Sequence, residues 1–144
     1  MKYLLIVFYM EYILLLTACI NPDGMPFTCL ADVGVRKKQY IEALNFYLKN
    51  TTRKIVFVEN SGTDISSSFK DFQHRIEFLC FDGNLCFDKR KGKGYGEALI
   101  LEYAMAKSEF ITDDVLIFKL TGRLQLININ RLIHYMDKLS PSKN

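Results

Sequence analysis

The feature that most constrains the fold is the alternation of short apolar runs with longer amphipathic segments along the chain. The apolar runs predict four strands, at residues 12–20, 54–59, 76–81 and 114–120. The amphipathic segments predict helices at residues 36–50, 96–108 and 129–139, with a short Ser-capped helix at residues 65–72. Strands that alternate with helices favour a parallel sheet. We therefore expect an α/β fold, a three-layer, mostly parallel sheet flanked by helices.

The length of 144 residues is enough for one domain with a proper core and too short for two. We expect this domain to span residues 10–137, between an N-terminal apolar extension at residues 1–9 and a disordered tail at residues 138–144. The net charge of +3 is too small to indicate nucleic-acid binding. We therefore predict no nucleic-acid partner.

The N-terminal stretch "MKYLLIVFYMEYILLLTAC" has three interpretations. It is a buried first strand, a lipoprotein signal whose "LTAC" (Leu16 to Cys19) resembles a cleavage box, or a transmembrane anchor. Glu11 lies within the apolar run, where a membrane would strongly disfavour an ionised carboxylate. The buried strand is the favoured interpretation. It predicts a cytoplasmic protein and leaves open a peripheral association with the inner face of the membrane.

The four cysteines form neither a CxxC motif nor a cluster with histidine at zinc spacing. We expect reduced thiols, although Cys80 and Cys86 are close enough in sequence to bridge across a turn. The sequence contains no D-x-D tripeptide, the acidic motif expected to hold Mg²⁺ or Mn²⁺. No cofactor is therefore predicted with certainty, and either metal remains open.

The stretch "DKRKGKGYGEALILEYA" places Gly92, Gly94 and Gly96 before a predicted helix. Their G-x-G-x-G spacing fits neither the dinucleotide fingerprint nor a P-loop. Glycines near the free N–H groups of a helix start, together with Lys91 and Lys93, would nevertheless suit a pyrophosphate. A solvated basic loop is the alternative, and the sequence does not choose between them.

The stretch "FKLTGRL" holds Lys119 inside an apolar strand and Arg123 directly after it. In a parallel α/β sheet, ligands bind outside the carboxyl ends of the strands, which is where Arg123 would lie. Arg suits bidentate binding of phosphate. The alternative is a structural ion pair of Lys119 or Arg123 with Glu97 or Asp114. Glu97 itself either compensates the helix dipole or contacts a sugar hydroxyl.

The order of "ILLLTACINPDG", "DVGVRKKQYIEALNFYLKN", "IVFVENSG", "KGKGYGEALILEYAMAKS" and "LIFKLTGRLQLININ" resembles bacterial glycosyltransferases of GT-A-like fold. Such enzymes assemble surface polysaccharide and lipopolysaccharide, and the resemblance covers residues 12–133. It implies a nucleotide-diphospho-sugar transferase half, a nucleotide-sugar donor and a glycan acceptor. In the place of the D-x-D motif this sequence carries Lys119 and Arg123, so transfer without a metal becomes an option. The chain is shorter than such enzymes, and we expect a truncated or partial transferase whose acceptor site and catalytic base are absent.

The residues expected to bind the donor come from the ends of the predicted strands and the starts of the predicted helices. They are Thr17, Asn21, Asp32, Arg36, Glu59, Asn60, Ser61, Gly62, Lys93, Gly94, Gly96, Glu97, Lys119, Thr121, Gly122 and Arg123. Lys93, Lys119 and Arg123 would stabilise the diphosphate, and Lys93 and Arg123 should converge on one site. No catalytic residue is identified. The alternatives are a lipid-anchored envelope binding protein and an inactive transferase half.

Overall fold

The computed structural model describes residues 11–25, 28–83 and 88–139. The expected extension at residues 1–9 lies outside the described residues, and so do residues 140–144 of the expected tail. The last described helix runs to Leu139, so the folded part extends two residues beyond the expected boundary at 137.

The sheet has four strands, all parallel, in the order β3-β2-β1-β4. They are β1 (Glu11–Ala18), β2 (Ile55–Glu59), β3 (Ile76–Cys80) and β4 (Val115–Thr121). The helices are α1 (Val33–Asn50), α2 (Lys93–Lys107) and α3 (Ile129–Leu139), with short 3₁₀ turns η1 (Ser66–Phe72) and η3 (Lys89–Lys91). The chain is therefore an α/β protein whose elements follow the predicted order.

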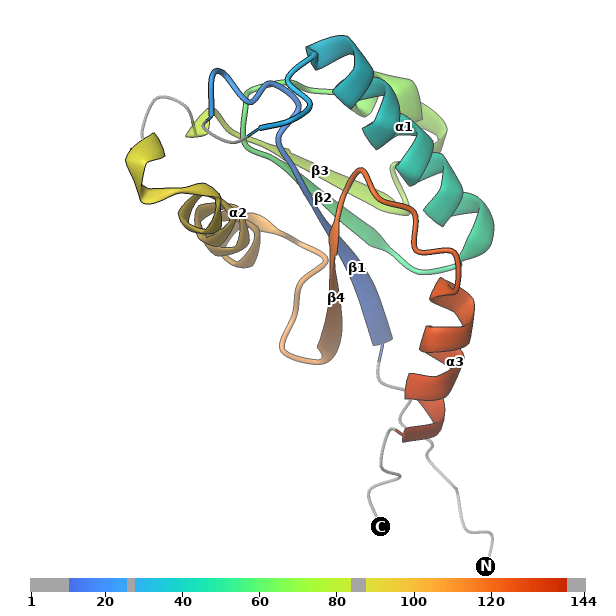
Figure 1. Ribbon diagram of the computed structural model, residues 1–144. Helices are drawn as coiled ribbons and strands as arrows, with labels where there is room; N and C mark the ends of the chain where they lie inside the picture. The colour runs from blue at the N-terminus through green and yellow to red at the C-terminus, as the bar shows by residue number, and fades with distance from the viewer. Residues whose placement is uncertain (1–10, 26–27, 84–87, 140–144) are drawn as a thin grey trace, which may run out of the picture.

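The helices cover both faces of the sheet and make three layers (Figure 1). One core cluster joins the sheet to α1, η1 and α3 through residues such as Leu44, Phe69 and Ile129. The other joins the opposite face to α2 through Ile100 and Ala104. The predicted three-layer, parallel architecture is confirmed.

The central strand is β1, which lies between β2 and β4. Its side chains alternate between the two faces: Leu14 and Leu16 join the core under α1, and Ile13 and Leu15 join the core under α2. All four are at most 1% exposed. A strand buried on both faces needs a continuous apolar run, which explains why this segment resembles a signal sequence. Cleavage before Cys19 would remove the strand that holds the sheet together.

None of the described helices combines the length and apolarity needed to cross a membrane.

Two helices begin earlier than the sequence predicts. α1 begins at Val33, because the carboxylate of Asp32 accepts a hydrogen bond from the Val35 amide at 2.8 Å and caps the helix. α2 begins at Lys93, so Gly94 lies inside the helix rather than in a loop. Gly92 is its N-cap residue, with a φ of 82° that favours glycine. The glycine-rich segment, for which a phosphate cradle and a solvated loop were both open, is therefore largely the first turn of this helix.

One smaller prediction needs correction, and the expected free thiol is confirmed for Cys80. The start of η1 has no serine side-chain cap, because the residue at its N-cap is Ile65. The carboxylate of Asp64 instead accepts a hydrogen bond from the Ser66 amide at 2.8 Å. Cys80 is a free thiol, and its suggested partner Cys86 lies outside the described residues.

Gly122 holds the end of β4 against the end of β1. Its amide donates to the Thr17 carbonyl at 2.8 Å. A Cβ added at Gly122 would lie 2.8 Å from that oxygen and 3.3 Å from the Tyr40 ring. Gly122 was expected to bind the donor, but the close approach of two backbones explains the glycine.

We expect Gly122→Ala to lower the free energy of unfolding by about 1–3 kcal/mol, because the added methyl must push a backbone carbonyl or a packed ring aside. Gly94→Ala is the matched control, since nothing lies within 4 Å of its added Cβ. Urea unfolding of both variants measures the difference. Equal stabilities would show that the contact relaxes without cost.

Candidate functional site

The strand order reverses between β1 and β4, since the chain builds β2 and β3 on one side of β1 and β4 on the other. Such a switch point leaves a crevice at the carboxyl ends of the strands, where α/β proteins bind ligands. A cavity of about 400 Å³ lies there, large enough for a small ligand. Thr17 and Thr121, which pair across β1 and β4, both line it.

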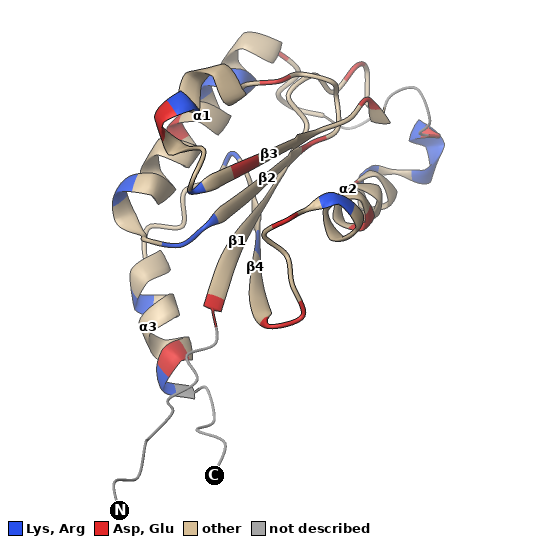
Figure 2. Ribbon diagram, turned by 180° about the vertical axis from the view of Figure 1, so that it is seen from behind, with Lys and Arg blue, Asp and Glu red and all other residues tan. Residues whose placement is uncertain are grey.

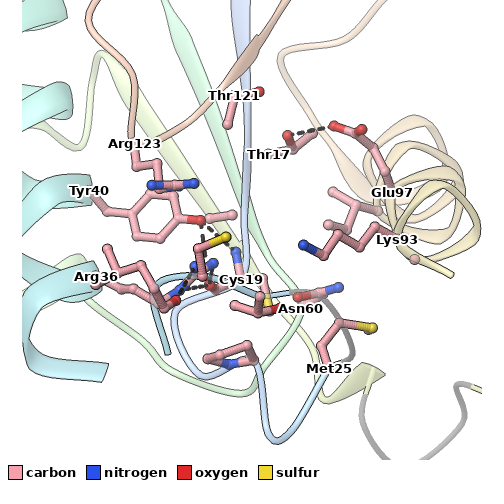
Figure 3. A pocket seen from close by; sticks show the side chains of 17 residues that line it. Thr17, Cys19, Met25, Arg36, Tyr40, Asn60, Lys93, Glu97, Thr121 and Arg123 are labelled. Atoms are coloured by element: carbon pink, nitrogen blue, oxygen red, sulfur yellow. Dashed lines mark hydrogen bonds between the residues drawn. The ribbon is translucent and has the colours of Figure 1, made fainter. Parts of the chain in front are cut away.

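Eight of the sixteen residues predicted to bind the donor line this cavity: Thr17, Arg36, Asn60, Lys93, Gly96, Glu97, Thr121 and Arg123. The other eight do not line it: Asn21, Asp32, Glu59, Ser61, Gly62, Gly94, Lys119 and Gly122. Lys93 extends from α2, and Arg123 lies across the cavity beside Tyr40 (Figure 3). Lys93 and Arg123 therefore line the same cavity from opposite sides, and their convergence on one ligand stays a prediction.

The loop after β1 forms much of the cavity wall and is held in place by α1. Arg36 and Tyr40 lie one turn apart on the buried face of this helix. The Tyr40 hydroxyl accepts from the Cys19 amide at 3.0 Å. The Arg36 guanidinium donates to the carbonyls of Cys19 at 2.9 Å and Leu30 at 3.0 Å. Arg36 thus fixes both ends of the loop, which is a structural task in addition to its place in the cavity wall.

Cys19 lies at the floor of the cavity but is a poor nucleophile. Burial raises the pKa of its thiol, and the nearby Arg36 charge offsets this only in part. The reactive form of cysteine is the thiolate. The cavity therefore offers no activated thiol at Cys19, and covalent catalysis through this residue is disfavoured.

Glu59 was expected to contact the donor, but the structure gives it another task. Its carboxylate is 1% exposed and accepts hydrogen bonds from three backbone amides. These are the amides of Ile20 at 2.9 Å, Ser61 at 3.0 Å and Thr63 at 2.8 Å, and the Ser61 hydroxyl donates to it as well. Glu59 therefore ties the loop after β1 to the loop after β2. Ser61 takes part in the same network, since its hydroxyl also accepts from the Asn21 amide at 2.9 Å.

The remaining predicted residues outside the cavity are explained by local geometry. The side chain of Asn21 accepts from the Asp23 amide at 3.1 Å and closes a turn. Gly62 has a φ of 72° at the turn after β2. Neither residue needs a ligand to account for its position.

Lys119 forms an ion pair with Glu97, which matches the structural alternative drawn from the sequence. Lys119 and Thr17 point to the face of the sheet that α2 covers, because they alternate in phase with Ile117 and Leu15. The Thr17 hydroxyl donates to the same Glu97 oxygen, Oε1, at 3.0 Å. The hydrogen bond from Lys119 holds the pKa of Glu97 below its usual range, so Glu97 is ionised at neutral pH.

The charged residues that line the cavity are mainly cationic. Arg36, Lys93 and Arg123 contribute positive charge, and Glu97, already paired with Lys119, is the single carboxylate among the lining residues. Arg36 is only 7% exposed, and no carboxylate of the described residues lies within ion-pair distance of it. Buried cations are normally balanced by an anion. The described residues that line the cavity therefore carry a net positive charge.

Asn60 adds a polar group to the cavity wall at the end of β2. Its side-chain oxygen is buried and has no hydrogen-bond partner among the described residues. Buried polar atoms are rarely left without a partner. A ligand or water with an N–H or O–H group near Asn60 would satisfy it.

Nine lining residues were not predicted from the sequence: Ala18, Cys19, Pro22, Met25, Thr28, Cys29, Leu30, Tyr40 and Ile100. Tyr40 and Ile100 were recognisable as apolar positions on helices but carried no sign of a ligand. The others belong to the end of β1 and its loop, whose course depends on the Arg36 and Glu59 contacts.

The basic turn η3 lies next to the N-terminal end of α2 (Figure 2). Lys89 donates to the backbone carbonyl and the carboxylate of Asp23, so it links η3 to the loop after β1. Lys91 lies over the Tyr95 ring at 4.5 Å. Within residues 11–25, 28–83 and 88–139, no cluster of three or more His, Cys, Asp or Glu side chains could hold a metal ion.

No family model matches this chain, and no curated protein or solved structure matches it either. What the site does is therefore argued from its own residues.

Proposed function

We propose that the chain binds a nucleotide-sugar at the β1/β4 crevice and is a glycosyltransferase, or the donor-binding part of one, of GT-A-like fold. The reaction would move a sugar from the nucleotide diphosphate to a surface glycan acceptor, at the inner face of the membrane. The single observation that carries the proposal is the cationic wall at the switch point. It is formed by Arg36, Lys93 and Arg123.

A diphosphate is the anion that best matches this wall. Lys93 and Arg123 approach the cavity from different elements, and two phosphate groups can bind two separated cations. When a glycosidic bond to a nucleotide diphosphate breaks, negative charge builds on the diphosphate, and fixed cations stabilise it most at that point. A metal ion can do the same work, and these side chains offer an alternative to it.

Other lining residues suit the nucleoside. Asn60 presents a buried acceptor without a partner, which an N–H group of a base would satisfy. The loop after β1 provides apolar surface at Pro22, Met25 and Leu30 against which a ring can pack. These features support a nucleotide over inorganic phosphate alone.

Calorimetric titration with UDP, GDP and CMP, and with sugar nucleotides built on each, tests the proposal. At least one nucleotide should bind with a dissociation constant in the micromolar range, as an ordinary substrate does. Titrations with and without Mn²⁺ show whether the cationic side chains suffice. The donor-site proposal would be lost if no member of the panel binds in either condition.

A further inference from the structure

The ion pair between Glu97 and Lys119 does more than stabilise the fold, because it fixes a carboxylate at the edge of the cavity. Three elements meet there: Thr17 from β1, Lys119 from β4 and Glu97 from the second turn of α2. Both Thr17 and Lys119 bind the Oε1 oxygen of Glu97. These two contacts involve Oε1, and the Glu97 side chain stays 41% exposed.

We propose that Glu97 accepts hydrogen bonds from hydroxyl groups of the bound ligand, and that Lys119 is the positioning residue that keeps it ready to do so. The inference rests on the proposed function and adds a second pole to the site. The cationic wall would hold the phosphates. Glu97 would select ligands that have a sugar diol next to the phosphates. Either the ribose or the transferred sugar supplies such a diol, and the experiment below distinguishes them.

The charges around Glu97 make an ionised acceptor the appropriate form. Lys119 faces it from β4, and Lys93, Arg36 and Arg123 line the same cavity. A carboxylate among cations keeps its negative charge and can only accept hydrogen bonds. It would repel a phosphate placed beside it, so the ligand groups that fit against Glu97 are hydroxyl or amino groups.

Glu97→Gln keeps the size of the side chain and removes its charge. Compared with wild type, the variant should bind a nucleotide or sugar nucleotide about 10- to 100-fold more weakly, as expected for a lost hydrogen bond to a charged group. Its affinity for inorganic pyrophosphate, which has no diol, should stay equal or rise. A loss for UDP and UDP-glucose alike, absent for the 2′,3′-dideoxy nucleotide, assigns the ribose. A loss confined to the sugar nucleotide assigns the transferred sugar.

Lys119→Met provides the readout that a purely structural role would not change. Without Lys119 the pKa of Glu97 should rise, because the hydrogen bond that lowers it most is gone. An unperturbed glutamate has a pKa of about 4.3. As the pH falls from 7, sugar-nucleotide affinity should therefore begin to drop at a higher pH in Lys119→Met than in wild type, while pyrophosphate shows no such difference.

Glu102→Gln is the control, because Glu102 is an exposed residue of α2 that does not line the cavity. Two results would overturn the inference, provided that nucleotides bind wild type. In the first, Glu97→Gln changes the affinities for nucleotide and pyrophosphate by the same factor. In the second, it changes neither affinity. An unchanged pH profile in Lys119→Met would remove the positioning role. If wild type binds no nucleotide at all, the proposed function itself fails. These results are separable, and circular dichroism confirms that each variant is folded.

Discussion

Replacing Glu59 with alanine should lower the free energy of unfolding by about 3 kcal/mol or more, the largest effect expected of any single change described above. The carboxylate is 1% exposed and accepts from the amides of Ile20, Ser61 and Thr63. The substitution leaves these donors without their acceptor, and each unsatisfied buried donor costs about 1–3 kcal/mol. Water that enters the vacated space would recover part of this, so we do not expect the full sum. Chemical denaturation followed by circular dichroism measures this change in the free energy of unfolding.

Glu42→Ala is the matched control for Glu59→Ala. Glu42 is an exposed residue of α1 whose carboxylate lies 3.8 Å from the ammonium of Lys38, one turn earlier. Exposed pairs of this kind contribute about 0.3–0.5 kcal/mol, so the control should change stability little. If both variants lose similar amounts, the amide network around Glu59 has no special weight. Glu59→Gln should fall between them, because its amide nitrogen cannot accept the hydrogen bonds that one carboxylate oxygen accepts.

Much of the fold could be predicted because the spacing of apolar residues along the sequence indicates which faces of a strand or helix are buried. The run around Leu14 and Leu16 predicted the central strand, since only a strand covered on both faces needs apolar residues at every position. α3 lies at the predicted residues, 129–139. The starts of α1 and α2 were misplaced by three residues each. There, Gly34 and Gly94 suggested loops, although the caps Asp32 and Gly92 begin the helices before them.

Residues of the candidate site could be predicted only where their position at the end of a strand was enough to place them at the cavity. Arg123 and Thr121 reached the cavity because the end of a parallel strand faces the ligand edge. Glu59 also ends a strand, yet it turns to the backbone of a loop that lies forty residues earlier in the chain. That choice depends on β1 and β2 being neighbours, which no local pattern encodes. The polarity of Glu59 indicated a buried polar contact but could not say with what.

The ion pair of Lys119 was partly readable. Strand alternation places Lys119 on the same face as Ile117, which packs under α2, and Glu97 lies near the start of that helix. The two residues could therefore be suspected of meeting once the sheet order was known. The sequence could not show whether the two residues stabilise the fold or bind the ligand, because both roles place Lys119 next to Glu97.

Removing Arg123 or Lys93 from the cationic wall should weaken nucleotide binding strongly. We expect Arg123→Ala and Lys93→Ala each to cost about 1.5–3 kcal/mol of binding free energy, or roughly 10- to 150-fold in affinity, if each holds a phosphate by a charged hydrogen bond. Stability should change little, because the hydrogen bond from Arg123 to Gln39 is long, at 3.5 Å, and Lys93 is exposed. The dissociation constants come from calorimetry with the tightest nucleotide found for wild type.

Arg131→Ala is the matched control, because Arg131 is an exposed arginine of α3 that does not line the cavity. It removes the same charge from the protein without touching the site, so its nucleotide affinity should equal that of wild type. The wild-type affinity should also fall as salt is added, because ions screen the attraction between the wall and the diphosphate. An affinity loss in Arg131→Ala as large as in Arg123→Ala would mean that net charge, and not a convergent pair of cations, attracts the ligand. Unchanged affinity in both Arg123→Ala and Lys93→Ala would place the diphosphate elsewhere on the molecule.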